Sequence, residues 1–387
     1  MELVLTAEQK MISEAAVAFF KERGAGRLRM LRDEARAEGR APTFSRETWR
    51  EMAELGWFGL LVPEADGGLG LGLSEAVLVL EAAGAKLASE PLVGSAIYGT
   101  DALVRCGDAA QRGRWLPRLI AGEAVIAVAT EEARSRGDLT RCEARAETAD
   151  GVTRLFADKR EVIAGAEADV FIVTTRRETG LEAWLVERVA PGVTVTGLDR
   201  VDAFPAARVV LDGVVVDGAK VSALGALGAQ STVNGLSLAR ERATVALAAE
   251  MLGGMAASLE MTLRYLHERE QFGVKIGTFQ ALRHRAARCY VEIELARSAI
   301  MAAARQCDLP VLDAKSKARL VQAVSLAKAR SSDAYDLVAA EAIQLHGGIG
   351  VTDEHVIGFY YKRSRVAAAT FGDASFHRDR WAQVAGY

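Results

Sequence analysis

The stretch HEREQFGVKIGTFQ, residues 267–280, separates two long segments in which apolar residues recur at helical intervals. A helix is predicted over about 237–269 and another over 279–306, because Ala and Leu dominate both segments. The glycines of FGVKIG (272–277) break the chain between these helices. The stretch therefore predicts a helical hairpin.

A second glycine stretch, HGGIG (346–350), ends a third predicted helix that begins near Asp313. A last helix is predicted to end near Ala385. Four helices of this length are typical of an up-and-down bundle, which we expect over residues 226–387.

Two side chains of the first stretch suit a phosphate group. The guanidinium of Arg269, beside a glycine turn, can form paired hydrogen bonds with phosphate oxygens, and Phe272 can shield that contact. The same residues fit an ordinary helix C-cap, since arginine favours helix C-termini and Gly273 can end a helix. In the second stretch, Gln344 precedes two glycines that allow close approach to the backbone, and a C-cap explains that pattern too.

The preceding region, residues 122–225, contains short β-branched runs and is predicted to be a β-domain. Asp150-Gly151 is a strong hairpin signal. No helical pattern separates the runs, so a parallel Rossmann sheet is not expected. The runs are VIAVAT (125–130), VFIVTT (170–175), AWLVER (183–188), VTVTGL (193–198) and ARVVLDGVVV (207–216).

Residues 1–121 are predicted to be mostly helical. Thr6 is the predicted cap of a first helix, Ser45 lies near the start of a second that Gly56 ends, and Ser74 is the predicted cap of a third. The residues of the second helix that we expect to face the core are Trp49, Met52 and Leu55.

Composition excludes several classes of protein. The 387 residues carry a net charge of −3, which gives no reason to expect nucleic-acid binding. No apolar run approaches the ~20 residues of a membrane span, and no basic segment precedes an apolar run at the N-terminus. The four cysteines form no C-x-x-C pair, which favours reduced thiols. We therefore expect a soluble cytoplasmic protein without a membrane partner.

Other familiar motifs are missing. The glycine string at 67–72 lacks G-x-G-x-x-G spacing, which favours a structural loop over a phosphate loop. No two of the five histidines are four residues apart, and no H-E-x-x-H occurs, so no metal site is expected.

Two further motifs complete a set of four: PEADGGLG (63–70) in the first helical region and LPRLIAGEAVIAVATEE (116–132) opening the β region. With these in order, the chain resembles the acyl-CoA dehydrogenase family along essentially its whole length. The resemblance implies an α+β fold with an N-terminal helical domain (1–121), a middle β-barrel or sandwich domain (122–225) and a C-terminal four-helix bundle (226–387).

The resemblance also implies chemistry. Members of the family hold FAD and dehydrogenate an acyl-CoA: the flavin takes a hydride from the β-carbon while a glutamate removes the α-proton. An electron-transferring flavoprotein then accepts the electrons. Each FAD is shared in a tetramer, so that one subunit cradles the ring in its β-domain and a neighbour's bundle supplies the adenosine and pyrophosphate contacts.

The adenosine-side half of that site matches the family here, through R-x-x-F-G and Q-x-x-G-G-x-G. The residues that the resemblance assigns to it are Arg269, Phe272, Gln280, Gln344, Gly347 and Gly348.

The flavin-ring half departs from the family. The family's T-E-P-G-A-G-S-D loop is TEEARSRGD (130–138), where Thr130, with Glu131 and Asp138, survives as a candidate cofactor residue. An ungapped alignment places Glu161 at the start of the strand that backs the ring, and burying that carboxylate there would carry a desolvation cost without an evident partner.

No glutamate stands at either family position for the catalytic base. The family's Y-E-G-T is TFGD (370–373), so Phe371 takes the place of the glutamate. A branched-chain subgroup has its glutamate early in the long bundle helix, where this chain has Ala243. Next to it, Thr244 replaces an arginine that usually helps hold the acyl-CoA.

Two other carboxylates are candidates for a displaced base. Asp373 follows Phe371 by two residues, and Glu250 lies on the same helix face as Ala243 but further along the axis. The alternative for Glu250 is a polar contact between helices.

Three hypotheses follow. In the first, the chain is a self-sufficient dehydrogenase with a displaced base, assembled with copies of itself. In the second, which we favour, it pairs with a second acyl-CoA dehydrogenase-like subunit in a heterotetramer and completes that partner's FAD site. In the third, it is a non-catalytic scaffold, which does not explain the preserved phosphate-side residues. Bacterial heteromeric members often act on bulky acyl-CoAs such as sterol side chains.

Overall fold

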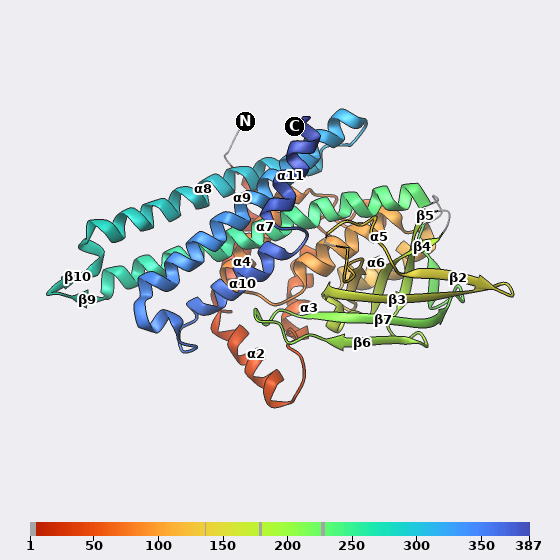
Figure 1. Cartoon of the computed structure of the whole chain (residues 1–387), viewed down its shortest axis with the longest axis horizontal. Helices are drawn as coiled ribbons and strands as arrows, with labels where there is room; N and C mark the ends of the chain where they lie inside the picture. The colour runs from red at the N-terminus through yellow and green to blue at the C-terminus, as the bar shows by residue number, and fades with distance from the viewer. Residues whose placement is uncertain (1–4, 136, 178–179, 226–228) are drawn as a thin grey trace. The chain divides into compact units, whose positions relative to one another are not determined.

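A computed structural model describes residues 5–135, 137–177, 180–225 and 229–387 of the chain (Figure 1). The chain forms two compact units. The first unit contains the chain up to Arg29, residues 72–88 and residues 244–387, and the second contains residues 30–71 and 89–243. Strands β1–β8 fall inside the predicted β region, whereas the domain boundaries at 121 and 225 stay predictions.

The helices and strands have the following bounds. The α-helices are α1 (Ala7–Lys21), α2 (Gly26–Ala37), α3 (Arg46–Glu54), α4 (Leu73–Ala85), α5 (Thr100–Cys106), α6 (Ala109–Ile120), α7 (Ala229–Glu268), α8 (Gln280–Asp308), α9 (Ala314–His346), α10 (Ile357–Ala369) and α11 (Ala374–Ala385). Short helical turns are η1 (Trp57–Gly59), η2 (Glu64–Asp66), η3 (Leu92–Gly99), η4 (Gly165–Glu167), η5 (Ile276–Thr278) and η6 (Gly347–Val351). The strands are β1 (Ile126–Ala129), β2 (Arg145–Ala149), β3 (Val152–Ile163), β4 (Val170–Arg177), β5 (Gly180–Glu187), β6 (Val193–Gly197), β7 (Ala206–Val215), β8 (Val221–Ala223), β9 (Glu270–Gln271) and β10 (Val274–Lys275).

The first unit is a bundle in which α9 packs against α8, α10 and α11. The sequence predicted α8 and α9 closely, because Asp313 accepts a hydrogen bond from Ser316 N as the N-cap of α9 and a glycine follows its last residue. The predicted last helix is divided into α10 and α11 by a turn at 370–373. In Figure 1, α7 and α8 run together to the small β9–β10 hairpin at one end of the bundle.

The N-terminus of α4 corrects one prediction. Its N-cap is Gly72, not Ser74, and Ser74 lies inside the helix. The capping carboxylate comes from Asp308, at the end of α8, which accepts hydrogen bonds from Leu73 N (2.7 Å), Ser74 N (3.0 Å) and Ser74 Oγ (2.7 Å). A Cβ at Gly72 would lie 2.5 Å from that carboxylate, so the glycine makes room for its approach.

The second unit is built on one sheet with the strand order β6-β7-β3-β2-β4-β5-β8, and β1 pairs with β4. Both pairings of β4 with β1 and β2 are parallel, and the other pairings in this sheet are antiparallel. This arrangement confirms that the sheet is not of the Rossmann type. The Asp150-Gly151 turn joins β2 to β3 with positive φ at both residues, as the hairpin signal predicted.

Helix α3 confirms the predicted cap and most of the predicted core. Ser45 accepts a hydrogen bond from Thr48 N, and Trp49 and Met52 are buried. Leu55 does not face the core: it follows the last residue of α3, and 46% of its surface is exposed. In the part of the chain that the structure describes, no helix is both long and apolar enough to cross a membrane.

Candidate cofactor and catalytic site

The end of α7 presents an exposed aromatic tip. Arg269 directly follows α7, and Phe272, at the turn of the β9–β10 hairpin, has a φ of +56° and is 91% exposed. The Phe279 ring meets it edge-on at 6.2 Å between centroids, and Gln280 is the exposed first residue of α8. An exposed aromatic side chain at a hairpin tip leaves a ring free to cover a bound group.

The end of α9 presents accessible backbone. Gln344 lies exposed in its last turn, and Gly347 (φ +64°) and Gly348 follow. A Cβ built at either glycine would have no neighbour within 4 Å, so the backbone there is open to an approaching group.

A ring stack connects these two ends. Tyr265, one turn before Arg269, stacks on His346, which precedes Gly347, with 4.7 Å between ring centroids. The structure therefore brings the two predicted motifs to one end of the same bundle. An exposed guanidinium at the same end of the bundle as open glycine backbone suits the phosphate groups of a dinucleotide, so these residues fit FAD.

The turn at 370–373 carries no carboxylate at the predicted base position. Phe371 occupies it with a φ of +61°, a conformation that is uncommon for an aromatic residue. Buried polar groups hold this turn: Lys328 Nζ donates to the carbonyls of Ala368 and Gly372 (2.9 Å each), and His377 Nε2 donates to the carbonyl of Phe371 (3.1 Å).

Lys328 and His377 were not predicted as part of this region. Burial lowers the pKa of Lys328 to about 7, although Asp373 and Asp336 act in the opposite direction. The sequence signal for Lys328 is its place on a face of α9 that otherwise carries small side chains, Val324, Ser325, Ser331 and Ser332.

The candidate replacement bases both have structural partners. Asp373 is the N-cap of α11 and accepts a hydrogen bond from Phe376 N (2.8 Å). Glu250 accepts one from Arg363 Nε (2.7 Å), with both side chains at most 10% exposed. Glu250 thus makes the polar contact between helices that was its alternative interpretation.

The second family position for a catalytic base is buried and carries no carboxylate. Ala243 lies in α7 with no exposed surface, and its neighbour Thr244 is also buried. A methyl group and a hydroxyl at these positions supply neither a base nor a cation.

The loop that begins at Thr130 is tied to its own unit by a carboxylate. Glu131 accepts hydrogen bonds from Arg240 Nη2 (3.0 Å), Ser135 Oγ (2.7 Å) and Gly137 N (3.3 Å). Thr130 itself is buried. The groups of this loop are engaged with each other.

The neighbouring carboxylate, that of Glu132, also binds groups within the same unit. Glu132, which stands where the family has proline, pairs with the fully buried Lys159 (2.5 Å) and accepts a hydrogen bond from Ala144 N (3.1 Å). Burial raises the pKa of Glu132. Lys159 and the backbone N–H groups of Glu143 and Ala144 lower this pKa by more than burial raises it, so the net shift is downward. The sequence did not predict this ion pair.

The Glu161 side chain is not buried in this chain. It is 64% exposed, the φ of Glu161 is +50°, and Arg200 Nη1 lies 3.8 Å from the carboxylate. The expected desolvation cost therefore does not arise within this chain.

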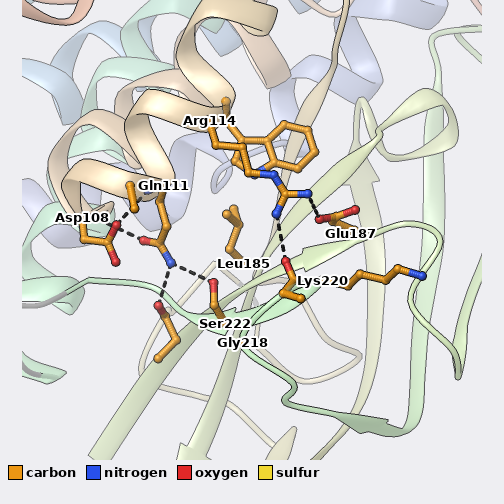
Figure 2. A pocket seen from close by; sticks show the side chains of 12 residues that line it. Asp108, Gln111, Arg114, Leu185, Glu187, Gly218, Lys220 and Ser222 are labelled. Carbon is orange, nitrogen blue, oxygen red and sulfur yellow. Dashed lines mark hydrogen bonds and ion pairs between the residues drawn. The ribbon is translucent and has the colours of Figure 1, made fainter.

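A separate hollow of 190 Å³ lies beside the first turn of α6 (Figure 2). Gln111 Nε2 donates to Ser222 Oγ (2.9 Å), Arg114 pairs with Glu187, and Figure 2 shows the Lys220 ammonium extending away from these groups. These groups bind each other where α6 packs against β5 and β8. The hollow between them is not part of the predicted site.

Comparison with known proteins agrees with this fold. Residues 231–386 match the family model of the acyl-CoA dehydrogenase C-terminal domain, and residues 6–123 match that of its N-terminal domain. Benzylmalonyl-CoA dehydrogenase of Aromatoleum aromaticum is 33% identical over 80% of this chain and 81% of its own length. Acyl-CoA dehydrogenase FadE27 of Mycobacterium tuberculosis is 29% identical over 86% of each chain.

Two solved structures described as paired proteins are also similar. A variant of the Tcur3481-Tcur3483 steroid ACAD has 30% identity and a TM-score of 0.83, covering 98% of this chain and 97% of its own. The ChsE4-ChsE5 complex from Mycobacterium tuberculosis has 25% identity and a TM-score of 0.86, covering all of both chains. The chain belongs to the acyl-CoA dehydrogenase family, which is a family of FAD-dependent flavoproteins.

Proposed function

We propose that this chain is a cytoplasmic subunit of a heteromeric acyl-CoA dehydrogenase, in which it completes the FAD site of an unlike, glutamate-bearing subunit. The reaction is α,β-dehydrogenation of an acyl-CoA thioester, with an electron-transferring flavoprotein as the acceptor. The observation that carries the proposal is Phe371, which puts an apolar ring where the family has its base.

The two halves of the cofactor site support this division of work. The adenosine-side residues, which include Arg269, Phe272 and Gln344, are exposed at the end of the bundle. The ring-side loop is instead occupied by its own ion pairs, through Glu131 and Glu132. A chain with an open half and a closed half can serve a neighbour's cofactor without holding its own ring.

Within the partner's site, this chain's residues would bind and orient. Arg269 would hold the pyrophosphate through its planar guanidinium, Phe272 would cover that contact from water, and the backbone at Gly347 and Gly348 would lie against the adenosine side. FAD, when bound, accepts the hydride. The partner subunit would supply the ring contacts and the carboxylate that removes the α-proton.

The paired relatives favour the same assembly. The names ChsE4-ChsE5 and Tcur3481-Tcur3483 each join two proteins, and the second is described as a steroid ACAD. A bulky acyl-CoA, such as one with a sterol side chain, is therefore the substrate class that we propose.

Absorption spectra test the proposal. We expect the chain purified alone to be colourless, and to become yellow and active only when co-expressed with a glutamate-bearing dehydrogenase subunit. A near-stoichiometric yellow protein from this chain alone, with turnover, would overturn the proposal and favour a self-sufficient enzyme.

Arg269→Ala tests this chain's share of the cofactor site. In the assembled complex it should lower the flavin-to-protein ratio at least several-fold, because the pyrophosphate loses a bidentate cation. Arg264→Ala is the matched control: Arg264 is exposed on α7 and pairs with Glu260. Equal flavin content in the two variants would contradict the assignment of Arg269.

A further inference from the structure

The glycine loop after α9 is closed by two histidine rings. His346 is the last residue of α9 and His355 lies just before α10, with 4.6 Å between their ring centroids. The segment between them contains Gly347 and Gly348, the open backbone of the adenosine-side half-site. The ring contact therefore joins the two ends of the segment that presents these glycines.

Other elements hold the ring pair in place. Tyr265 of α7 also stacks on His346. Inside the loop, Thr352 N and Thr352 Oγ both donate to the carbonyl of Ile349 (3.1 and 2.8 Å). These contacts connect the loop to α7 and connect residues within the loop to each other. We call the three rings of Tyr265, His346 and His355 the histidine stack.

Two different features favour the neutral imidazoles: the hydrogen bond that His355 accepts and the burial of His346. His346 Nδ1 donates to the carbonyl of Ala342 (2.7 Å), so Nε2 is the remaining site for a proton, and it is buried without a partner among the described residues. His355 Nδ1 accepts from Ile357 N (3.2 Å), so a proton there would break this bond at the start of α10. Protonation of either ring removes a bond or buries an unpaired N–H group.

The surroundings of both histidines lower their pKa values. Burial lowers the pKa of His346, and His355 lowers it further, while the carbonyl of Ala342 acts in the opposite direction. Burial and the Arg29 guanidinium of α2 lower the pKa of His355. Tyr265 faces His346 from α7, and on α10 the nearby Lys362 is paired with Asp353.

We propose that the histidine stack is a pH-sensitive fastening of the glycine loop, so that acid opens the loop and releases the cofactor that this half-site helps to hold. The link to the cofactor rests on the proposed function, whereas the fastening itself does not. Because the closed loop binds protons less tightly than an opened one, the closed form is fully favoured above the ordinary histidine pKa of about 6.5. Below that pH, the opened form gains protons and becomes populated.

Hydrogen exchange of the isolated chain tests the fastening. After correction for the intrinsic pH dependence of exchange, we expect residues 347–354 to lose protection at least tenfold between pH 7.5 and pH 5.5. His355→Phe keeps a ring in the stack but removes one of its two protonation sites, so its protection should change less with pH than that of the wild type. Equal pH dependence in the wild type and in His355→Phe would overturn the proposal.

Two further variants separate the ring contact from the charge. His355→Ala removes the ring, so residues 347–354 should be unprotected at both pH values; wild-type protection in this variant would also overturn the proposal. Should His355→Phe fail to fold, as judged by circular dichroism at pH 7.5, His355→Asn takes its place: with no ring and no proton to gain, it should leave the loop equally open at both pH values.

Cofactor retention by the assembled complex tests the second step. We expect the FAD dissociation constant to rise at least fivefold from pH 7.5 to pH 5.5 in the wild-type complex and to rise less with His355→Phe. A loop that opens without loss of FAD would overturn the link to the cofactor and leave the fastening intact. If no flavin complex forms with any partner, the proposed function fails, while hydrogen exchange still decides the fastening.

Discussion

At the scale of single residues, one buried cation organises the turn that has lost its glutamate. Lys328 is fully buried, and its ammonium reaches the carbonyls of Ala368 and Gly372. The family's base position is therefore still held in a defined conformation, although Phe371 now occupies it.

Lys328→Met should destabilise the chain most at alkaline pH. The folded-state pKa is lowered from 10.5 to about 7, so between these values the unfolded chain binds a proton that the folded chain does not. The wild type then gains stability as pH rises above 7, by up to about 1.4 kcal/mol per pH unit, and the methionine variant lacks this gain. Loss of the two hydrogen bonds adds about 1–3 kcal/mol at all pH values.

Urea unfolding at pH 6, 7.5 and 9 measures this difference. Lys317→Met is the control, because Lys317 is exposed on the same helix. A stability difference between the wild type and Lys328→Met that is the same at all three pH values would contradict the explanation.

At the scale of elements, the helix termini carry much of the specificity of the bundle. Gly72 leaves α4 without a side-chain cap of its own, and the Asp308 carboxylate supplies that cap from the end of α8. This contact joins two helices far apart in sequence through charge-assisted hydrogen bonds.

Asp308→Ala should lower the free energy of unfolding by about 1–2 kcal/mol, since α4 loses its capping acceptor. Asp308→Asn should recover part of this loss because an amide oxygen still accepts. Thermal or urea denaturation ranks the three proteins. Equal stability of the alanine and asparagine variants would show that the capping bonds contribute nothing.

At the scale of the whole molecule, the departure from the family's active-site pattern is not confined to one residue. The base is absent at Phe371, and the ring-side loop is closed separately by Glu131 and Glu132. Under the proposed function, the base and the ring contacts must both come from a partner subunit.

Phe371→Glu should therefore fail to convert the chain alone into a dehydrogenase. We expect no acyl-CoA turnover with an artificial electron acceptor and no bound flavin, because the closed loop is unchanged. Phe371→Leu controls for folding. Turnover by the glutamate variant alone would revive the self-sufficient hypothesis.

The sequence by itself determined the local features of this protein. Apolar periodicity, the caps at Thr6, Ser45 and Asp313, and the Asp150-Gly151 turn act within a few residues. The alternation of helical and β regions and the motifs at 267–280 and 342–350 follow from the same short-range signals. The pattern at 370–373 already showed that the base is missing.

Only the tertiary structure decided which distant groups meet. The cap of α4 by Asp308, the pair of Glu132 with Lys159 and the stack of His346 on His355 each join groups whose spacing follows no local period. An ungapped alignment placed Glu161 where burial against the flavin ring would be costly, and the side chain lies exposed, because burial depends on packing around the whole sheet. Hydrogen bonding and burial are set by three-dimensional proximity, which a single sequence does not specify.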